Sequence, residues 1–206
     1  MTNRPSDIMF SDSVKAVQEQ LGSRRGYESM AERGGFQSEL NAEVTAFIAQ
    51  RDSFYLATAS ADGRPYIQHR GGPKGFLRVL DERTLGFADF RGNKQYISVG
   101  NLNENDRAFV FLMDYANRQR IKLWGRAEIV EDDPELVERL RIDGYDGKPE
   151  RAFLFHVEAW DVNCPQHIVP RFSHEDIEPL RERIRALEAE NLELRERLGK
   201  APDASH

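Results

Sequence analysis

The segment 89–95 sets cationic and amide side chains beside a glycine: Arg91, Asn93 and Lys94 surround Gly92. It follows an expected strand over 84–88 and opens a helix expected over 91–99. Backbone N–H groups at such a turn, the positive end of the helix dipole and two cations together suit a phosphate monoester. A surface turn with solvated charges has the same composition, and for this segment taken alone that interpretation is favoured.

A second stretch that could bind a ligand is 68–76, where Gln68, His69 and Arg70 end an expected strand. Three glycines follow within five positions, and glycine lets a ligand or another backbone segment approach closely. A binding loop and a mobile loop with an incidental histidine explain this stretch equally well.

Alternation along 118–124 predicts a third polar surface. The residues that would share one strand face are Arg118, Arg120, Lys122 and Trp124. A cationic and aromatic face can hold a planar anion. For an isolated strand, however, an ordinary solvent-facing surface is the favoured interpretation.

The sequence has one cysteine, Cys164, which excludes an internal disulfide framework. His167 follows three positions later, but a metal ion would need further ligands nearby in the sequence, and we find none. No metal site is therefore predicted, and Cys164 is expected to be a small buried thiol without a catalytic role.

The elements that would position these residues are mostly strands. Strand patterns lie at 53–59, 64–70, 76–80, 84–88, 108–113, 120–130 and 153–162. The turns between them are short, and Asp62-Gly63 is a hairpin signal. These patterns predict a small antiparallel barrel of some six strands over 51–172, with a short helix at 134–140.

The first fifty residues are expected to form a helical brace. Ser11 and Asp12 would cap a helix that ends at Gly22, and a second helix is expected over 38–50. The glycines between them, Gly26, Gly34 and Gly35, are expected to break the helical pattern.

Composition narrows the classes of protein that are possible. The chain has 206 residues and a formal net charge of −6, so a non-specific nucleic-acid binder is not expected. No stretch approaches the roughly 18 apolar residues of a membrane span, and the first residues lack the apolar run of a signal peptide. We expect a cytoplasmic protein with no membrane and no nucleic-acid partner.

Taken in order, these stretches resemble the pyridoxamine 5′-phosphate oxidase-like family of FMN-binding split β-barrels over roughly 47–172. The motifs that carry the resemblance are Asp62-Gly63-Arg64-Pro65, Gln68-His69-Arg70, Gly92-Asn93-Lys94, Arg118-Gln119-Arg120, Trp160 and Arg171. The resemblance implies a mainly β (α+β) fold: a six-stranded antiparallel split β-barrel with flanking helices. It also implies a homodimer with FMN at the subunit interface and a small-molecule substrate.

The resemblance assigns cofactor-binding roles residue by residue. It gives Gln68, His69 and Arg70 polar contacts to FMN, and it gives Asn93 and Lys94 a grip on the phosphate. The family has a Ser-Arg-Lys triplet where this chain has Gly92-Asn93-Lys94, so Arg91 is the candidate for the missing cation. Gln119 is expected to reach the flavin, and Trp160 and Arg171 are expected to approach it from the partner subunit.

One departure concerns the substrate. The family's oxidases carry an Arg-x-His motif, whereas Arg171-Phe172-Ser173-His174 has one residue more. We therefore expect an FMN-dependent oxidoreductase with a different substrate. The alternatives are a flavin-binding carrier or sensor without turnover, a structural dimer whose site is empty, and a deazaflavin in place of FMN. The catalytic residues stay unassigned, with His69 and His167 as the candidates for proton transfer.

The C-terminal segment 173–200 has its own pattern, and 201–206 is expected to be a disordered tail. The apolar positions repeat as a heptad, with Ile177, Ile184, Asn191 and Leu198 at a and Leu180, Leu187 and Leu194 at d. Isoleucine at a, leucine at d and a lone asparagine at a are typical of a parallel two-stranded coiled coil. The alternative is an amphipathic helix that packs on its own barrel.

Overall fold

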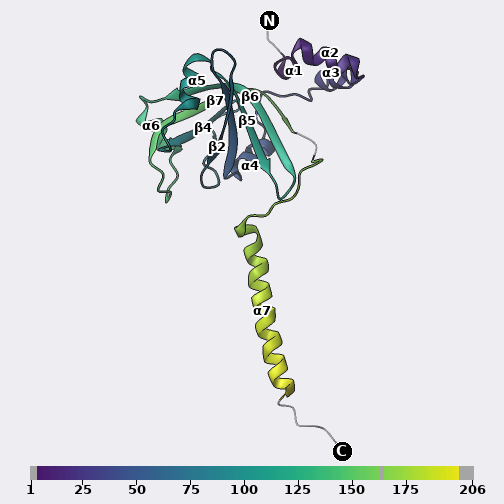
Figure 1. Ribbon diagram of the computed structural model, residues 1–206, viewed down its shortest axis with the longest axis vertical. Helices are drawn as coiled ribbons and strands as arrows, with labels where there is room; N and C mark the ends of the chain where they lie inside the picture. Colours follow the sequence, from purple (N-terminus) through teal and green to yellow (C-terminus); the bar gives the residue numbers. More distant parts are fainter. Residues whose placement is uncertain (1–3, 163–164, 200–206) are drawn as a thin grey trace, which may run out of the picture.

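The computed structural model describes residues 4–162 and 165–199, so the expectations for Cys164 and for 201–206 lie outside the described residues. One antiparallel sheet dominates the fold (Figure 1). Its strands are β1 (Ser53–Ala59), β2 (Pro65–Gly71), β3 (Arg78–Val79), β4 (Thr84–Phe90), β5 (Arg107–Asp114), β6 (Gln119–Val130) and β7 (Pro149–Val162). Their order in the sheet is β2-β1-β5-β6-β7-β4-β3, which leaves the barrel open between its two edge strands.

The expected count of six strands is corrected to seven. Every expected strand is present, but the one expected over 76–80 contracts to the two residues of β3. Phe76 and Leu77 are both buried, although they are neighbours in the chain. The Phe76 N–H donates to the Pro73 carbonyl at 3.0 Å, so the chain turns here and Phe76 and Leu77 belong to a loop folded into the core.

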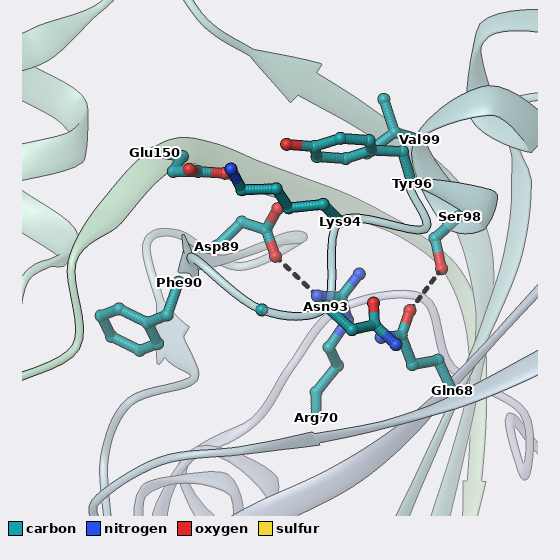
Figure 2. A pocket seen from close by; sticks show the side chains of 11 residues that line it. Gln68, Arg70, Asp89, Phe90, Asn93, Lys94, Tyr96, Ser98, Val99 and Glu150 are labelled. Carbon is teal, nitrogen blue, oxygen red and sulfur yellow. Dashed lines mark hydrogen bonds and ion pairs between the residues drawn. The ribbon is translucent and has the colours of Figure 1, made fainter.

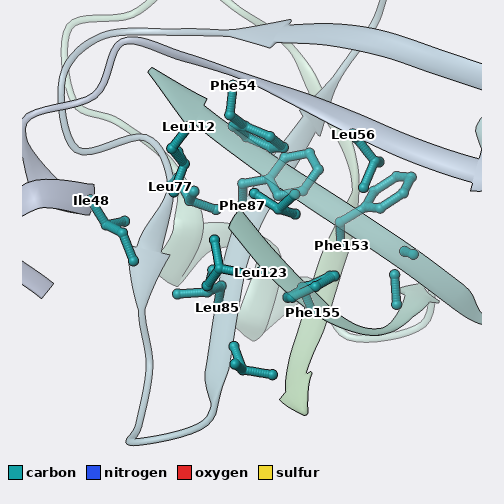
Figure 3. Packing of buried hydrophobic residues seen from close by; sticks show 14 of the residues in the cluster. Ile48, Phe54, Leu56, Leu77, Leu85, Phe87, Leu112, Leu123, Phe153 and Phe155 are labelled. Atoms are coloured by element: carbon teal, nitrogen blue, oxygen red, sulfur yellow. The ribbon is translucent and has the colours of Figure 1, made fainter. Parts of the chain in front are cut away.

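The core lies on the concave side of the sheet. Phe87 stacks on Phe153 with ring centroids 5.0 Å apart, and Phe54 meets the edge of Phe87 at 5.2 Å. Figure 3 shows these rings beside leucines of several strands. Alternation along β6 is as expected, because Ile121, Leu123 and Ala127 are buried while their neighbours are not. This core holds β4 directly and holds β2 through its pairing with β1, and these two strands carry the site described below.

Four short helices precede the sheet: α1 (Pro5–Met9), α2 (Asp12–Gln20), α3 (Arg24–Glu32) and α4 (Ala42–Ala49). The expected Ser11 cap of α2 is confirmed, since its hydroxyl accepts from the Val14 N–H at 3.3 Å. The expected break at Gly26 is wrong, because this glycine lies inside α3. An ion pair between Arg24 and Glu28, one helical turn apart at 3.0 Å, supports α3 against the glycine's cost of about 1 kcal/mol.

The remaining helices are α5 (Ile97–Glu104), α6 (Pro134–Leu140) and α7 (His174–Gly199). The bounds of α6 are as predicted, whereas α5 begins six residues later than the helix expected from 91. Figure 1 shows α7 as a single helix that projects away from the barrel. No helix of the described chain is long and apolar enough to cross a membrane.

Candidate functional site

A pocket of about 240 Å³ opens where β2 and β4 end and the chain continues into α5. We call it the β2–β4 pocket. Its lining residues are Gln68, Arg70, Asp89, Phe90, Gly92, Asn93, Lys94, Tyr96, Ser98, Val99 and Glu150. Figure 2 shows polar side chains from both strands and from the connecting loop facing one another across it. The pocket therefore brings together four residues that the sequence singled out: Gln68, Arg70, Asn93 and Lys94.

The alternation of β2 decides which of its polar residues reach the pocket. Gln68 and Arg70 point into it, whereas His69 lies between them on the opposite face, where its ring meets Tyr55 at 5.6 Å. Ser98, which is buried on α5, donates a hydrogen bond to Oε1 of Gln68 at 3.0 Å. The amide of Gln68 is therefore held in one orientation.

The loop between β4 and α5 has an unusual backbone. Lys94 has a φ of 59° and Tyr96 a φ of 52°, values in the left-handed region that residues with a Cβ rarely adopt. Backbone strain of this kind, worth on the order of 1–3 kcal/mol per residue, is concentrated at functional sites. Tyr96 is also the N-cap of α5, and its side chain makes no capping hydrogen bond. The loop thus carries Lys94 beside a helix N-terminus whose amide groups Tyr96 does not cap.

A buried carboxylate anchors the floor of the pocket. Asp89 pairs with Nη1 of Arg70 at 2.6 Å and lies 3.6 Å from Nε of Arg151. Burial raises the pKa of Asp89, although the two guanidinium charges act to lower it. Nε of Arg70 is buried and has no hydrogen-bond partner among the residues that the structure describes. The Nε–H group of Arg70 is therefore a donor without a partner among the described residues.

Sequence reasoning missed Asp89 and Ser98 as site residues. Asp89 could have been noticed, because a lone carboxylate closes the otherwise apolar stretch of β4. Ser98 gives no such signal, since one serine near a helix start has no distinctive spacing.

Three of the predicted residues lie elsewhere in the chain. Gln119 is exposed at the start of β6. Trp160 is buried in β7, and its indole N–H donates to the Glu39 carbonyl at 2.9 Å. The Arg171 guanidinium lies 4.7 Å from the centre of the Tyr115 ring, beside a second cavity of about 530 Å³.

Two other predicted residues are near the β2–β4 pocket without lining it. Arg91 follows β4, but its guanidinium pairs with Glu150 at 2.9 Å on an exposed rim. His69, as described above, faces away. The single chain thus assembles four of the nine residues assigned to the cofactor.

Comparison with known proteins fits this architecture. A family model described as pyridoxamine 5′-phosphate oxidase matches residues 40–164. No curated protein matches the sequence. HupZ of Group A Streptococcus is 20% identical with a TM-score of 0.50, and the match covers 64% of this chain and 98% of HupZ.

Two other solved structures are more distant. An FMN-binding protein from Syntrophomonas wolfei is 15% identical with a TM-score of 0.47, covering 71% of this chain and 97% of that one. A protein of the pyridoxinephosphate oxidase family from Clostridium acetobutylicum is 18% identical with a TM-score of 0.44, covering 66% and 94%. On the extent of the family match, this chain belongs to the pyridoxamine 5′-phosphate oxidase family.

Proposed function

We propose that this protein is an FMN-binding flavoprotein that acts as an oxidoreductase on a small-molecule substrate. The observation that carries the proposal is the β2–β4 pocket, where Arg70 and Lys94 lie beside a strained loop and a helix N-terminus. A phosphate monoester needs several hydrogen-bond donors and positive charge. The Arg70 guanidinium, the Lys94 ammonium and the Asn93 amide line the pocket and supply such donors.

The size of the pocket supports a site completed by a second copy of the chain. At about 240 Å³, it falls below the roughly 300–1,000 Å³ that is usual for whole-ligand sites. The pocket suits a phosphate and the adjoining part of a chain, so the flavin ring would extend beyond it. We propose that the ring lies at a homodimer interface, as the resemblance implies.

The three assigned residues that lie away from the pocket differ in what they can offer a flavin ring. Gln119 and Arg171 are exposed, so their polar groups can reach a ring brought by a second copy. The indole N–H of Trp160 is already bonded to Glu39, and its side chain is almost fully buried. We therefore assign polar contacts to Gln119 and Arg171, and leave Trp160 at most an edge contact.

Bound FMN would supply hydride or electron transfer. The chain would hold the phosphate through Arg70 and Lys94, and would fix the position of Arg70 through Asp89. Gln68, whose orientation Ser98 sets, would offer its amide N–H groups to the part of the ligand that leaves the pocket.

The absorption spectrum of the full purified chain tests the proposal. We expect a yellow protein that releases FMN on denaturation and is bleached by NADH or NADPH without oxygen. A colourless protein that takes up no added FMN would contradict the cofactor, as would a bound deazaflavin. A protein that binds FMN but is reduced by neither nicotinamide and reduces no acceptor would contradict the oxidoreductase and support the carrier or sensor.

A further inference from the structure

Helix α7 has an apolar stripe that nothing in the described chain covers. The helix runs as one unit from His174 to Gly199 and stands clear of the barrel (Figure 1). Ile184, Leu187 and Leu194 are 47%, 44% and 49% exposed. The alternative in which this stripe packs on its own barrel is therefore wrong, and the stripe needs another explanation.

The exposed stripe follows the heptad over its full length. We call it the α7 seam, formed by Ile177, Leu180, Ile184, Leu187, Asn191, Leu194 and Leu198. A hollow along one stretch of the helix is lined by three of these residues, Ile184, Leu187 and Asn191, by the flanking Glu188 and Arg195, and by Leu192 at position b. Pro179, the proline inside α7, falls at position c and so lies outside the seam.

The charges that flank the seam divide into two groups. Toward the two ends of the helix, charges pair along their own chain: Glu178 and Arg185, both at b, pair at 3.3 Å, and Glu193 at c pairs with Arg197 at g at 2.6 Å. The central e and g residues are different. Arg183, Glu188, Glu190 and Arg195 form no ion pair or side-chain hydrogen bond with any residue that the structure describes.

We propose that the α7 seam binds the α7 seam of a second copy of this chain, as a parallel two-stranded coiled coil in register. In that arrangement each g residue meets the e residue five positions later on the other helix. Arg183 then meets Glu188, and Glu190 meets Arg195, so all four unpaired charges gain a partner of opposite sign. Asn191 at position a meets its own copy, where two amides can hydrogen-bond to each other.

A second copy fits this surface better than an unrelated apolar partner. An ordinary hydrophobic groove needs no complementary charges five residues apart and gains nothing from an asparagine in the middle of the stripe. A seam that pairs with itself needs both, since the asparagine sets register and the charges set orientation.

The coil rests on the proposed homodimer of the barrels. Three heptads are short for an isolated coiled coil. Two barrels that already associate would hold their tails close together, and the high effective concentration would let the short seam form. The seam takes no part in flavin binding, so its failure and that of the cofactor site are distinguishable.

Cross-linking of the full chain tests the seam. In a Cys164→Ser background, which leaves a single introduced thiol, Leu194→Cys places that thiol at a d position away from the helix centre. We expect oxidised glutathione to convert it to a homodimeric disulfide about tenfold or more faster than the control Glu196→Cys, which lies at f on the outer face. Equal rates for the two variants would overturn the proposal, and an antiparallel pairing would not join residue 194 to its own copy.

A charge exchange provides the second test. Arg183→Glu in the Leu194→Cys chain should slow the cross-link by roughly twofold to tenfold, because like charges then face each other twice across the seam. Adding Glu188→Arg should restore the rate. The two residues are five apart and do not face each other on one helix, so rescue requires the partner helix. A double variant as slow as the single variant would contradict the parallel register.

Discussion

Two buried aspartate–arginine pairs lie in different parts of this barrel, and they differ in what their arginines leave unused. Asp114 at the end of β5 pairs with Arg51 at 2.8 Å, and Asp89 at the end of β4 pairs with Arg70 at 2.6 Å. The side chains are similarly buried in both pairs. The two pairs differ, however, in how many of their donors and acceptors form hydrogen bonds.

The Asp114–Arg51 pair is saturated. Arg51 also donates to the carbonyls of Phe47 and Met113, both at 3.2 Å, and Asp114 accepts from the backbone and side-chain N–H groups of Asn117 at 2.9 and 3.1 Å. Burial alone would raise the pKa of Asp114, but the hydrogen bonds from Asn117 and the charge of Arg51 outweigh it and lower the pKa.

The Asp89–Arg70 pair is not saturated. Arg70 has a buried Nε without a partner among the described residues, and burial raises the pKa of Asp89 despite the nearby guanidinium groups. Both pairs line a cavity, so the cavity alone does not separate them. The comparison teaches that a saturated pair joins two elements of the fold, whereas an unsaturated pair has capacity left for a ligand.

Alanine substitution of Arg51 and of Arg70 should give the largest difference between the two pairs, measured as the loss in the free energy of unfolding. Arg51→Ala leaves a buried aspartate that favours the charged form, so we expect a loss of about 3–5 kcal/mol in the free energy of unfolding. Arg70→Ala should cost less, about 1–3 kcal/mol, because burial raises the pKa of Asp89, so this carboxyl can take up a proton more readily once its partner is removed. Denaturant titration measures both values.

Flavin content provides the contrasting readout for the same variants. Measured below its unfolding temperature, Arg51→Ala should retain flavin, whereas Arg70→Ala should lose it. If the two variants lost equal stability and both retained flavin, the distinction between the pairs would be wrong.

The cation in the strained loop should have the next largest effect. Lys94→Ala removes one charge-assisted contact to phosphate, worth about 1.5–3 kcal/mol, so FMN should bind about ten- to a hundredfold more weakly. Lys148→Ala is the matched control, because Lys148 is exposed and does not line the pocket. Equilibrium titration with FMN measures both variants, and unchanged affinity in Lys94→Ala would remove this residue from the site.

The two aspartates should give opposite pH dependences of stability. The lowered pKa of Asp114 stabilises the fold above the unfolded-state pKa, so its contribution is lost as the pH falls below about 4. The raised pKa of Asp89 has the reverse sign, and its contribution is lost as the pH rises past about 4.

Unfolding free energies across this range would show the contrast as differences from wild type. The difference for Asp114→Asn should shrink toward acid, and the difference for Asp89→Asn should shrink toward neutral pH. Slopes of the same sign would show that the two carboxylates have equivalent surroundings.

The smallest effect is expected at Gln119, which lies outside both pairs. Gln119→Ala should shift the absorption maximum or the redox potential of the bound flavin while the affinity for phosphate stays unchanged. A spectrum and a potential identical to those of wild type would show that Gln119 does not contact the ring.

The strands were predictable because burial alternates, as in β1 and β6, or because the residues form a short apolar run, as in β4, and β1 and α6 have the predicted bounds. The start of α5 was not predictable, since lysine and tyrosine give no sign that Lys94 and Tyr96 adopt left-handed backbone conformations. The same loop places Lys94 in the pocket, so the site depends on left-handed backbone conformations that the sequence patterns do not predict.

Pairing between distant residues was equally hidden. Asp89 and Arg70 are 19 residues apart, and neither segment indicates that the two side chains pair. Only the fold, which places the ends of β2 and β4 together, shows that one carboxylate neutralises one of the expected phosphate ligands. The family resemblance predicted a set of cofactor-binding residues that includes Gln68, Arg70, Asn93 and Lys94. The fold explains why these four lie in one pocket, because it places the ends of β2 and β4 together.

The affinities of the full chain for FMN and riboflavin test the central claim most directly, because the two flavins differ only by the phosphate. If Arg70 and Lys94 bind that phosphate, the affinity for FMN should exceed the affinity for riboflavin by about a hundredfold or more, since two charge-assisted contacts depend on the phosphate. Equal affinities, measured by calorimetry on flavin-free protein, would contradict the account of the β2–β4 pocket as a phosphate site.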